Sequence, residues 1–125
     1  MATFTGFEAH DYVSLTTYKK SGETASTPVW IVPKDGKLYV WTNSASWKVK
    51  RLRRDPRCSV APCNASGKKI LGPSASGTAR FVTPVEKEPI VDALKKRYGF
   101  GYTVIAFVNR LRGISDYVVI ELQAT

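Results

Sequence analysis

A serine-containing turn followed by a run of bases is the part of this sequence best suited to chemistry. The stretch "WTNSASWKVKRLRRDPR", residues 41–57, carries two serines and then a dense set of lysines and arginines. If a helix begins after the serines, its free backbone N–H groups and the positive end of its dipole favour a bound anion. Ser44 and Ser46 add hydroxyl donors, and Lys48 adds a positive charge in the first turn. The pattern predicts a site for a phosphate-bearing small molecule, without the glycines of a P-loop or a dinucleotide fold.

Two other interpretations of the basic run stay open. Val49 and Leu52 are three residues apart and can face a core together, which would leave the bases as an ordinary solvated helix face. Nucleic acid needs a basic groove with aromatic side chains for stacking, and Trp30, Trp41 and Trp47 are close in sequence. However, two of these tryptophans fall in predicted strands, and no recognition-helix or RNA-binding motif is present. Nucleic acid is therefore the weakest of the three interpretations.

The size and charge of the chain narrow the choice of partner. Its 125 residues fit one domain spanning residues 1–125, with 43% hydrophobic and 23% charged residues. Nineteen lysines and arginines against ten acids give a net charge of +9, which favours anionic partners. A domain this small has little room to enclose a large ligand alone, so we expect a site at a subunit interface.

Targeting and metal-binding signals are missing from the sequence. The first residues, "MATFTGFEAHDYVSL", do not resemble a secretory signal, and no apolar run approaches the ~20 residues that span a bilayer. We therefore expect a cytoplasmic protein with no membrane partner. Cys58 and Cys63 have no second pair, and His10 is the single histidine, so we expect no metal site. On a strand, positions 58 and 63 would face opposite sides, which argues against a disulfide.

The remaining pattern predicts a mainly β (α+β) protein. Two hairpin signals, "KSGE" and "KDGK", join three predicted strands into an antiparallel meander. A short helix is capped by Ser44 or Ser46 and stopped by Asp55-Pro56, and a longer helix is ended by Gly99. The segment 102–113, "YTVIAFVNRLRG", fits a helix or a strand. The predicted strands are 12–20, 24–34, 37–42, 57–64, 74–82 and 115–123, and the predicted helices are 47–54 and 84–98. The short connections favour a small closed or half-closed barrel.

The order of these elements resembles a known family. The segments "YVSLTTYKKSGETASTPVWIV", "GKLYVWTNSASWKVKRLRRDPRCSV" and "GTARFV" resemble the pyridoxine-phosphate-oxidase-like split β-barrel flavoproteins. Within them the chain looks most like the actinobacterial branch that uses the deazaflavin coenzyme F-420. The similarity covers residues 12–82, with a weaker match of the C-terminal helix and strand. It implies a homodimeric split β-barrel with cofactor sites between subunits, and an oxidoreductase that transfers hydride between the deazaflavin and an unsaturated or quinone-like small molecule.

The resemblance also implies the residues of the cofactor site. In that family the second strand lies along the cofactor ring, and the third strand and the following turn hold the phosphate. Mapped onto this sequence, the ring would lie beside Ser26, Thr27, Pro28, Val29 and Trp30, the ribityl phosphate at Trp41, Thr42, Ser46 and Lys48, and the anionic lactyl and glutamyl tail at Lys50 and Arg51.

One departure from the family pattern bears on the cofactor. Flavin-mononucleotide (FMN) oxidases of the family commonly have Arg-Lys in the phosphate turn and more bases on the ring strand. Here these places hold Trp47-Lys48 and "STPVW". Fewer charges at the mononucleotide position, and more charges downstream, favour the longer deazaflavin. FMN is the alternative cofactor, and a haem-like ligand or a non-enzymatic cofactor-binding protein also stays open.

No residue is predicted to be catalytic. The sequence has no Ser-His-Asp set, paired acids or metal cluster, and a deazaflavin carries the hydride step itself. His10, Tyr12, Tyr98 and Tyr102 are candidate proton donors, although each is also typical of a structural role. An apolar substrate slot could be lined by Trp30, Trp47, Tyr98 and Phe100, and packing is an equally ordinary role for each.

Overall fold

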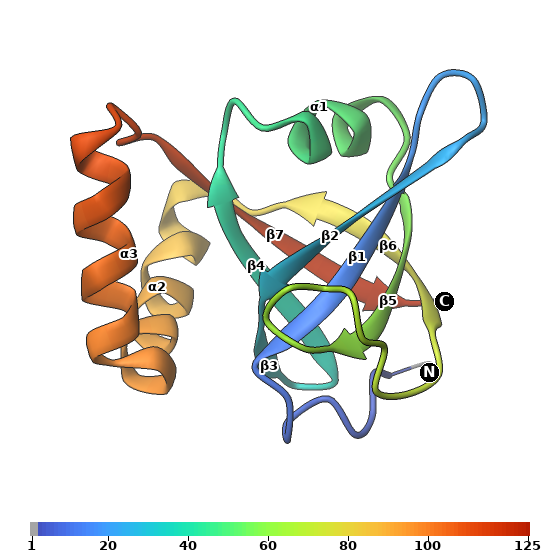
Figure 1. Ribbon diagram of the computed structural model, residues 1–125, viewed down its shortest axis with the longest axis horizontal. Helices are drawn as coiled ribbons and strands as arrows, with labels where there is room; N and C mark the ends of the chain where they lie inside the picture. The colour runs from blue at the N-terminus through green and yellow to red at the C-terminus, as the bar shows by residue number, and fades with distance from the viewer. Residues whose placement is uncertain (1–2) are drawn as a thin grey trace.

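Seven antiparallel strands curl into a half-open barrel, with helices beside it and across one end (Figure 1). A computed structural model describes residues 3–125. The strands are β1 (Tyr12–Tyr18), β2 (Thr24–Trp30), β3 (Val32–Lys34), β4 (Lys37–Asn43), β5 (Arg57–Cys63), β6 (Ala75–Phe81) and β7 (Tyr117–Ala124). The helices are α1 (Trp47–Arg54), α2 (Pro84–Tyr98) and α3 (Phe100–Leu111). The strand order is β2-β1-β5-β6-β7-β4-β3, which confirms the split β-barrel class.

The barrel is split between β2 and β4. The sequence predicts one strand over 24–34 in a three-stranded meander, and this prediction is wrong at Ile31. There the chain turns out of β2 into β3; among residues 3–125, β2 pairs only with β1 and β3 pairs only with β4. The Tyr98 hydroxyl accepts a hydrogen bond from the Ile31 N–H at 3.1 Å and lies 2.7 Å from the Ile31 carbonyl oxygen. Because a side chain from α2 satisfies the backbone N–H and carbonyl of Ile31, the two strands can separate and end on opposite edges of the sheet.

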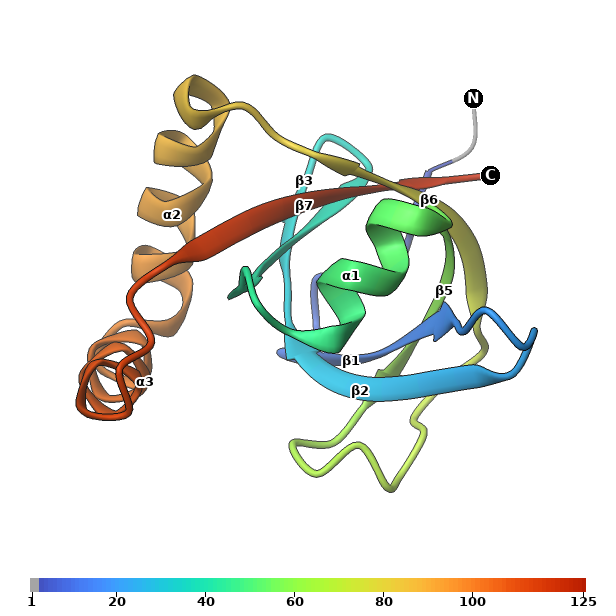
Figure 2. The same cartoon turned by 90° about the horizontal axis from the view of Figure 1, so that it is seen from above.

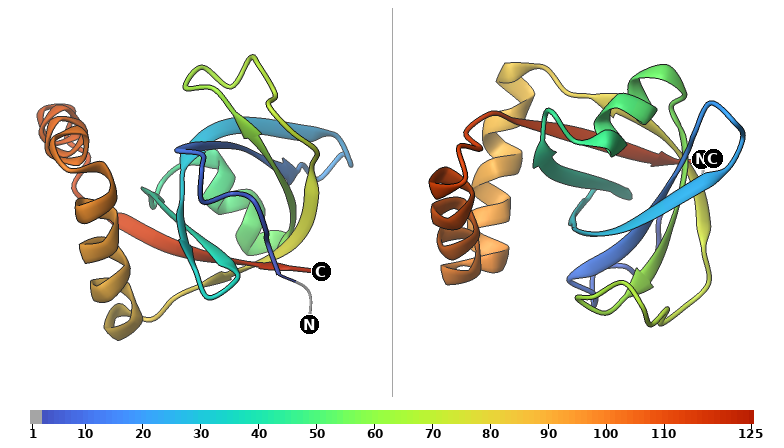
Figure 3. Two further views of the ribbon diagram at one scale, coloured as in Figure 1. Left: turned by 90° about the horizontal axis from the view of Figure 1, so that it is seen from below. Right: turned by 45° about the horizontal axis from the view of Figure 1, so that its top comes forward.

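The alternation expected of strand residues is clearest in β4, whereas β5 and β7 each have four consecutive buried residues. Side chains such as Leu15, Val40 and Ile120 are fully buried. The helix predicted over 47–54 is α1, and Val49 and Leu52 point from it into the core, as its pattern predicts. Figure 2 shows α1 lying across one end of the barrel. The N-terminal segment crosses the opposite end (Figure 3, left), where Phe4 is buried.

Two helices stand beside the barrel, with α3 outermost (Figure 1). The predicted helix 84–98 is α2, whose first turn is closed by a capping box between Thr83 and Glu86. The ambiguous segment 102–113 forms most of α3, a helix with no buried residue. The residue between α2 and α3 is Gly99. Its φ of +52° lets the chain turn directly from one helix into the other. Within residues 3–125, no helix is long and apolar enough to cross a membrane.

The two cysteines lie at opposite ends of β5. Cys58 and Cys63 are both buried and both free, in agreement with the prediction that they do not form a disulfide. Burial raises the pKa of each thiol, so both are held in the protonated, unreactive form.

Candidate functional site

A pocket of about 290 Å³ lies where the barrel is split, between the ends of β2 and β4 and under α3. Figure 3, right, shows α1 above β2 and β4 at this end of the molecule. The pocket is lined by several of the residues predicted to hold a cofactor: Pro28, Val29, Trp30, Trp41, Thr42 and Lys48. The split thus brings together a strand and a turn that the sequence separates by about a dozen residues.

Two tryptophans form the flat walls of this pocket. Trp30 stacks on Tyr98, with ring centroids 4.2 Å apart and ring planes 8° apart. Trp41 stacks on Tyr117 at 4.1 Å and 17°, and Tyr102 packs at a tilt on the same indole. Each indole is therefore backed by a tyrosine that fixes its orientation. Rigid aromatic faces of this kind suit a planar, conjugated ligand.

The cation of the pocket is Lys48, in the first turn of α1. Its side chain is half-buried, and in residues 3–125 no carboxylate forms an ion pair with it. Burial, and then the positive charge of Arg51, lower the pKa of Lys48 below the usual lysine value. A bound phosphate or carboxylate would relieve both effects, because an opposite charge favours the ammonium form. Lys48 therefore has the electrostatic character of an anion site.

The turn between β4 and α1 is fixed by side chains of its own. The Asn43 Oδ1 accepts a hydrogen bond from the Ala45 N–H at 2.9 Å, and the Asn43 carbonyl accepts from the Ser46 N–H at 3.1 Å. The Ser44 hydroxyl donates to Asp116 Oδ2 at 2.7 Å and is not a helix cap. Ser46 occupies the N-cap position, yet its hydroxyl makes no capping bond. The first-turn N–H groups of α1 therefore have no side-chain cap, as an anion site at this position requires.

Two predicted residues carry buried hydroxyls without a partner. The Oγ of Ser46 and the Oγ1 of Thr27 make no hydrogen bond with any residue from 3 to 125. A buried hydroxyl left unpaired costs about 1–3 kcal/mol, so both positions suit an additional hydrogen-bonding group nearby. Ser26 differs, because its hydroxyl lies 2.7 Å from that of Thr16 on the exposed face of the hairpin.

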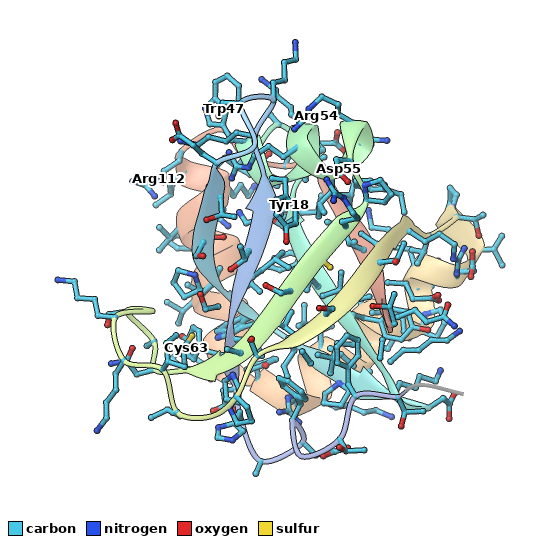
Figure 4. All side chains as sticks on the ribbon, turned by 90° about the vertical axis from the view of Figure 1, so that its right-hand side faces the viewer. Tyr18, Trp47, Arg54, Asp55, Cys63 and Arg112 are labelled. Atoms are coloured by element: carbon cyan, nitrogen blue, oxygen red, sulfur yellow. The ribbon has the colours of Figure 1, made fainter. Side chains whose placement is uncertain are left out.

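The other two predicted residues, Lys50 and Arg51, face a separate hollow. We call this the basic hollow: about 710 Å³ between α1 and the β1–β2 hairpin, lined by Lys19, Lys20, Trp47, Lys50, Arg51 and Arg54. Figure 4 shows Trp47 and Arg54 at this end of the molecule. The Arg51 Nε donates to Thr17 Oγ1 at 2.7 Å, which fixes the guanidinium against β1 beside the hollow. The three bases predicted to bind one ligand are thus divided between two sites: Lys48 lies in the pocket at the split, and Lys50 and Arg51 line the basic hollow.

The candidate proton donors and substrate-slot aromatics mostly lie elsewhere. His10 lines a hollow beside Phe4 and Pro62, away from the split. The Tyr98 hydroxyl is committed to backbone groups of Ile31 and Asp11, so its role is structural. Phe100 is 81% exposed and Trp47 is 70% exposed. Tyr12 and Trp30 do line the pocket, whereas Tyr102 only supports Trp41.

The sequence reasoning missed one wall of the pocket. Ile105, Asn109, Ile114 and Tyr117 line it, and none of them was predicted as a site residue. The signal was present in part, because a helical assignment of 102–113 would have put positions 105 and 109 on one face. The sequence does not show that this face of the helix packs against the split of the barrel, because that contact depends on tertiary packing.

Comparison with known proteins identifies the family. The model of the pyridoxamine 5'-phosphate oxidase family matches residues 2–125, and the chain belongs to this family. A search of the curated proteins returns no match.

Several solved structures share the fold. Atu2129 of Agrobacterium tumefaciens, a protein of unknown function, has a TM-score of 0.72 at 18% identity over 92% of this chain and 48% of its own. This chain thus spans about half the length of Atu2129. The conserved hypothetical protein Rv2991 of Mycobacterium tuberculosis has a TM-score of 0.70 at 23% identity, over 98% and 82% of the two chains. The heme storage protein HutZ of Vibrio cholerae has a TM-score of 0.70 at 12% identity, over 100% and 92%. Identities this low show the shared fold alone.

Proposed function

We propose that the protein is a coenzyme F-420-dependent oxidoreductase, acting on an unsaturated or quinone-like small molecule. The proposal rests mainly on the surroundings of Lys48. This half-buried cation has no carboxylate partner in residues 3–125, and it lies in a pocket lined by Trp30 and Trp41. A flat aromatic slot with a cation at one end suits a planar ring that carries a phosphate. When bound, the deazaflavin supplies the hydride chemistry.

The residues present fit such a cofactor. Pro28, Val29 and Trp30 would flank the ring from β2, whose outer edge is free because β2 pairs only with β1. Lys48 would hold the phosphate, with Thr42 beside it. The unpaired hydroxyls described above, on β2 and at the N-cap of α1, are further donors close to the ring strand and the phosphate turn. The protein's own part is to orient the ring and to keep water from it.

The basic hollow would take the rest of the cofactor. Its bases have no carboxylate among the lining residues, and the lactyl and glutamyl tail of the deazaflavin is anionic. Arg51 lines the hollow, and its positive charge is the second cause, after burial, that lowers the pKa of Lys48. A ligand with a phosphate at Lys48 can therefore continue toward Lys50 across Arg51. FMN ends at the phosphate and would leave these bases unused.

We also propose a homodimer with the site between subunits, in the cytoplasm. One protomer offers about 290 Å³, which is at the lower limit of drug-sized pockets and too small for a tricyclic ring together with a substrate. Apolar side chains of α3 at and next to the pocket lining are exposed, with Ile105 41% and Val108 42% exposed. A second copy would cover apolar surface of this kind and complete the wall.

Haem binding is the second candidate function, because HutZ shares the fold. His10, the only histidine, lies in a different hollow from the pocket at the split, which disfavours it as an iron ligand there. A non-enzymatic protein that shields a deazaflavin would have the same pocket and differ only in turnover.

The test is a titration of the purified protein with coenzyme F-420, FMN and haem, followed by fluorescence and absorbance. We expect micromolar or tighter binding of the deazaflavin and weaker binding of the other two. Tight binding of FMN alone, with a yellow protein on purification, would contradict the cofactor assignment. Deazaflavin binding without turnover of enone- or quinone-like compounds would favour the shielding role.

A further inference from the structure

The C-terminal end of α3 builds the wall of the pocket that faces the predicted cofactor residues. The Ile114 N–H bonds to the Asn109 carbonyl at 2.8 Å, and the Gly113 N–H bonds to the Arg110 carbonyl at 3.0 Å. Gly113 has φ +79°. This is the Schellman arrangement, which reverses the chain and brings the residue after the glycine back against the helix. It places Asn109 and Ile114 side by side in the pocket lining.

Asn109 is an unexpected residue at this place. Asparagine is among the poorer helix formers, because its side chain competes for backbone groups outside the helix. Here its backbone is fixed by the Schellman bond, and its half-buried side chain lines the pocket. Its neighbours on the same wall, Ile105 and Ile114, are apolar. The amide of Asn109 is therefore the polar group that the end of α3 adds to this wall of the pocket.

The carboxamide offers what a planar heterocycle recognises. It presents an N–H donor and a carbonyl acceptor side by side in one plane. The pyrimidine part of a flavin or deazaflavin has an N–H between two carbonyls. Its N–H can donate to the amide oxygen, and one of its carbonyls can accept from the amide N–H. Lys48 lies in the same pocket on the phosphate turn, so a ligand anchored there by its phosphate can present its ring edge to α3.

We infer that Asn109 binds the pyrimidine edge of the cofactor ring, and that the Schellman turn after α3 positions it for this contact. The inference rests on the proposed function only in requiring a cofactor with that edge. Both coenzyme F-420 and FMN have it, and haem does not. Asn109 is thus a specificity residue for the ring, as Lys48 is for the phosphate.

The experiment compares three variants with the wild type in titrations with coenzyme F-420, FMN and haem. Asn109→Ala removes the amide, Asn109→Leu removes it while keeping the branched side-chain shape, and Thr103→Ala is the control on the exposed side of the same helix. We expect both Asn109 variants to bind F-420 about tenfold more weakly, the loss of one or two hydrogen bonds. Thr103→Ala should bind normally. Melting temperatures without ligand should not fall for Asn109→Ala, because alanine is the better helix former.

The outcomes separate this inference from the proposed function. Unchanged F-420 affinity in Asn109→Ala, or affinity restored in Asn109→Leu, would overturn the inference and leave the proposed function standing. If the wild type binds FMN and not F-420, with both Asn109 variants weaker, the proposed function fails and the inference holds. Binding of haem alone, or of none of the three, would overturn both.

Discussion

The two ends of β4 place cations in opposite surroundings. At its first end, Lys37 and Arg80 lie around the carboxylate of Glu121, at 3.5 and 2.8 Å. Arg80 also pairs with Glu86 on α2 at 2.7 Å, and the Tyr39 hydroxyl donates to Glu121 at 3.1 Å. The hydrogen bond from Arg80 is the main cause that lowers the pKa of Glu121. Every charge in this cluster has a partner, and together they join α2 to the sheet.

At the other end of β4, Lys48 is half-buried beside Arg51, and no carboxylate of residues 3–125 pairs with it. A protein gains nothing in stability from such an arrangement, because burial and like charge both disfavour the ammonium ion. Partnered cations such as Arg80 join elements of the fold. We propose that Lys48, half-buried and without a carboxylate partner in residues 3–125, binds the anion of the cofactor instead.

The sharpest way to break this comparison is to remove Lys48. We expect Lys48→Met to weaken coenzyme F-420 binding by about 1.5–3 kcal/mol, the size of a charge-assisted hydrogen bond. Fluorescence titration measures it, and Lys37→Met, at the other end of β4, is the control that should bind normally. Equal affinity of Lys48→Met and wild type would remove Lys48 from the site.

Removing Arg80 should have the opposite effect: it should lower the stability of the fold and leave the affinity for coenzyme F-420 unchanged. Arg80→Ala leaves the buried Glu121 with only Lys37 and Tyr39 as partners. Because the arginine side chain is 49% exposed, solvent screening reduces the loss, and we expect about 1–2 kcal/mol of unfolding free energy. Urea unfolding measures it. A large loss of F-420 affinity at unchanged stability would show that the two clusters are not separate.

Acid should weaken the partnered cluster. The side-chain hydrogen bond from Arg80 is the main cause that lowers the pKa of Glu86 from 4.5 to about 2. A depressed carboxylate pKa contributes stability that is complete above pH ~4.5 and is lost as pH falls toward 2. Thermal unfolding from pH 7 to pH 2 should show a shallower decline in Glu86→Gln than in wild type. Parallel curves for the two proteins would show that Glu86 does not contribute to the loss of stability in acid.

The basic hollow should give the smallest and most salt-sensitive effect. Lys50 is exposed, with its Nζ 4.5 Å from the Trp47 ring centroid, so its attraction for an anionic tail is screened by salt. Lys50→Gln should weaken F-420 binding about threefold at low salt and little at moderate salt. FMN, which lacks the tail, provides the ligand control. An equal effect on both ligands would show that the tail of coenzyme F-420 does not bind in the basic hollow.

The local elements were predictable from sequence, and the long-range ones were not. The pattern of Val49 and Leu52 and the stop at Asp55-Pro56 predicted α1 with its correct bounds, because helix limits depend on neighbouring residues. The break at Ile31 depends on the hydroxyl of Tyr98, 67 positions away in sequence, so no local pattern indicates it. Lys48 was expected at the site from the serine-containing turn as well as from the family resemblance, and the residues of β2 were expected there from the resemblance alone. The wall formed by Asn109 depends on how α3 packs, and α3 has no buried residue to fix that packing from sequence.

The most direct test of the account is a crystal structure of the protein with coenzyme F-420 bound. We expect the ring at the split between β2 and β4, beside Trp30, with the phosphate within hydrogen-bonding distance of the Lys48 Nζ. A cofactor bound in another depression, or a phosphate that contacts only bases of the basic hollow, would contradict the central claim that the unpartnered lysine at the barrel's split holds the cofactor.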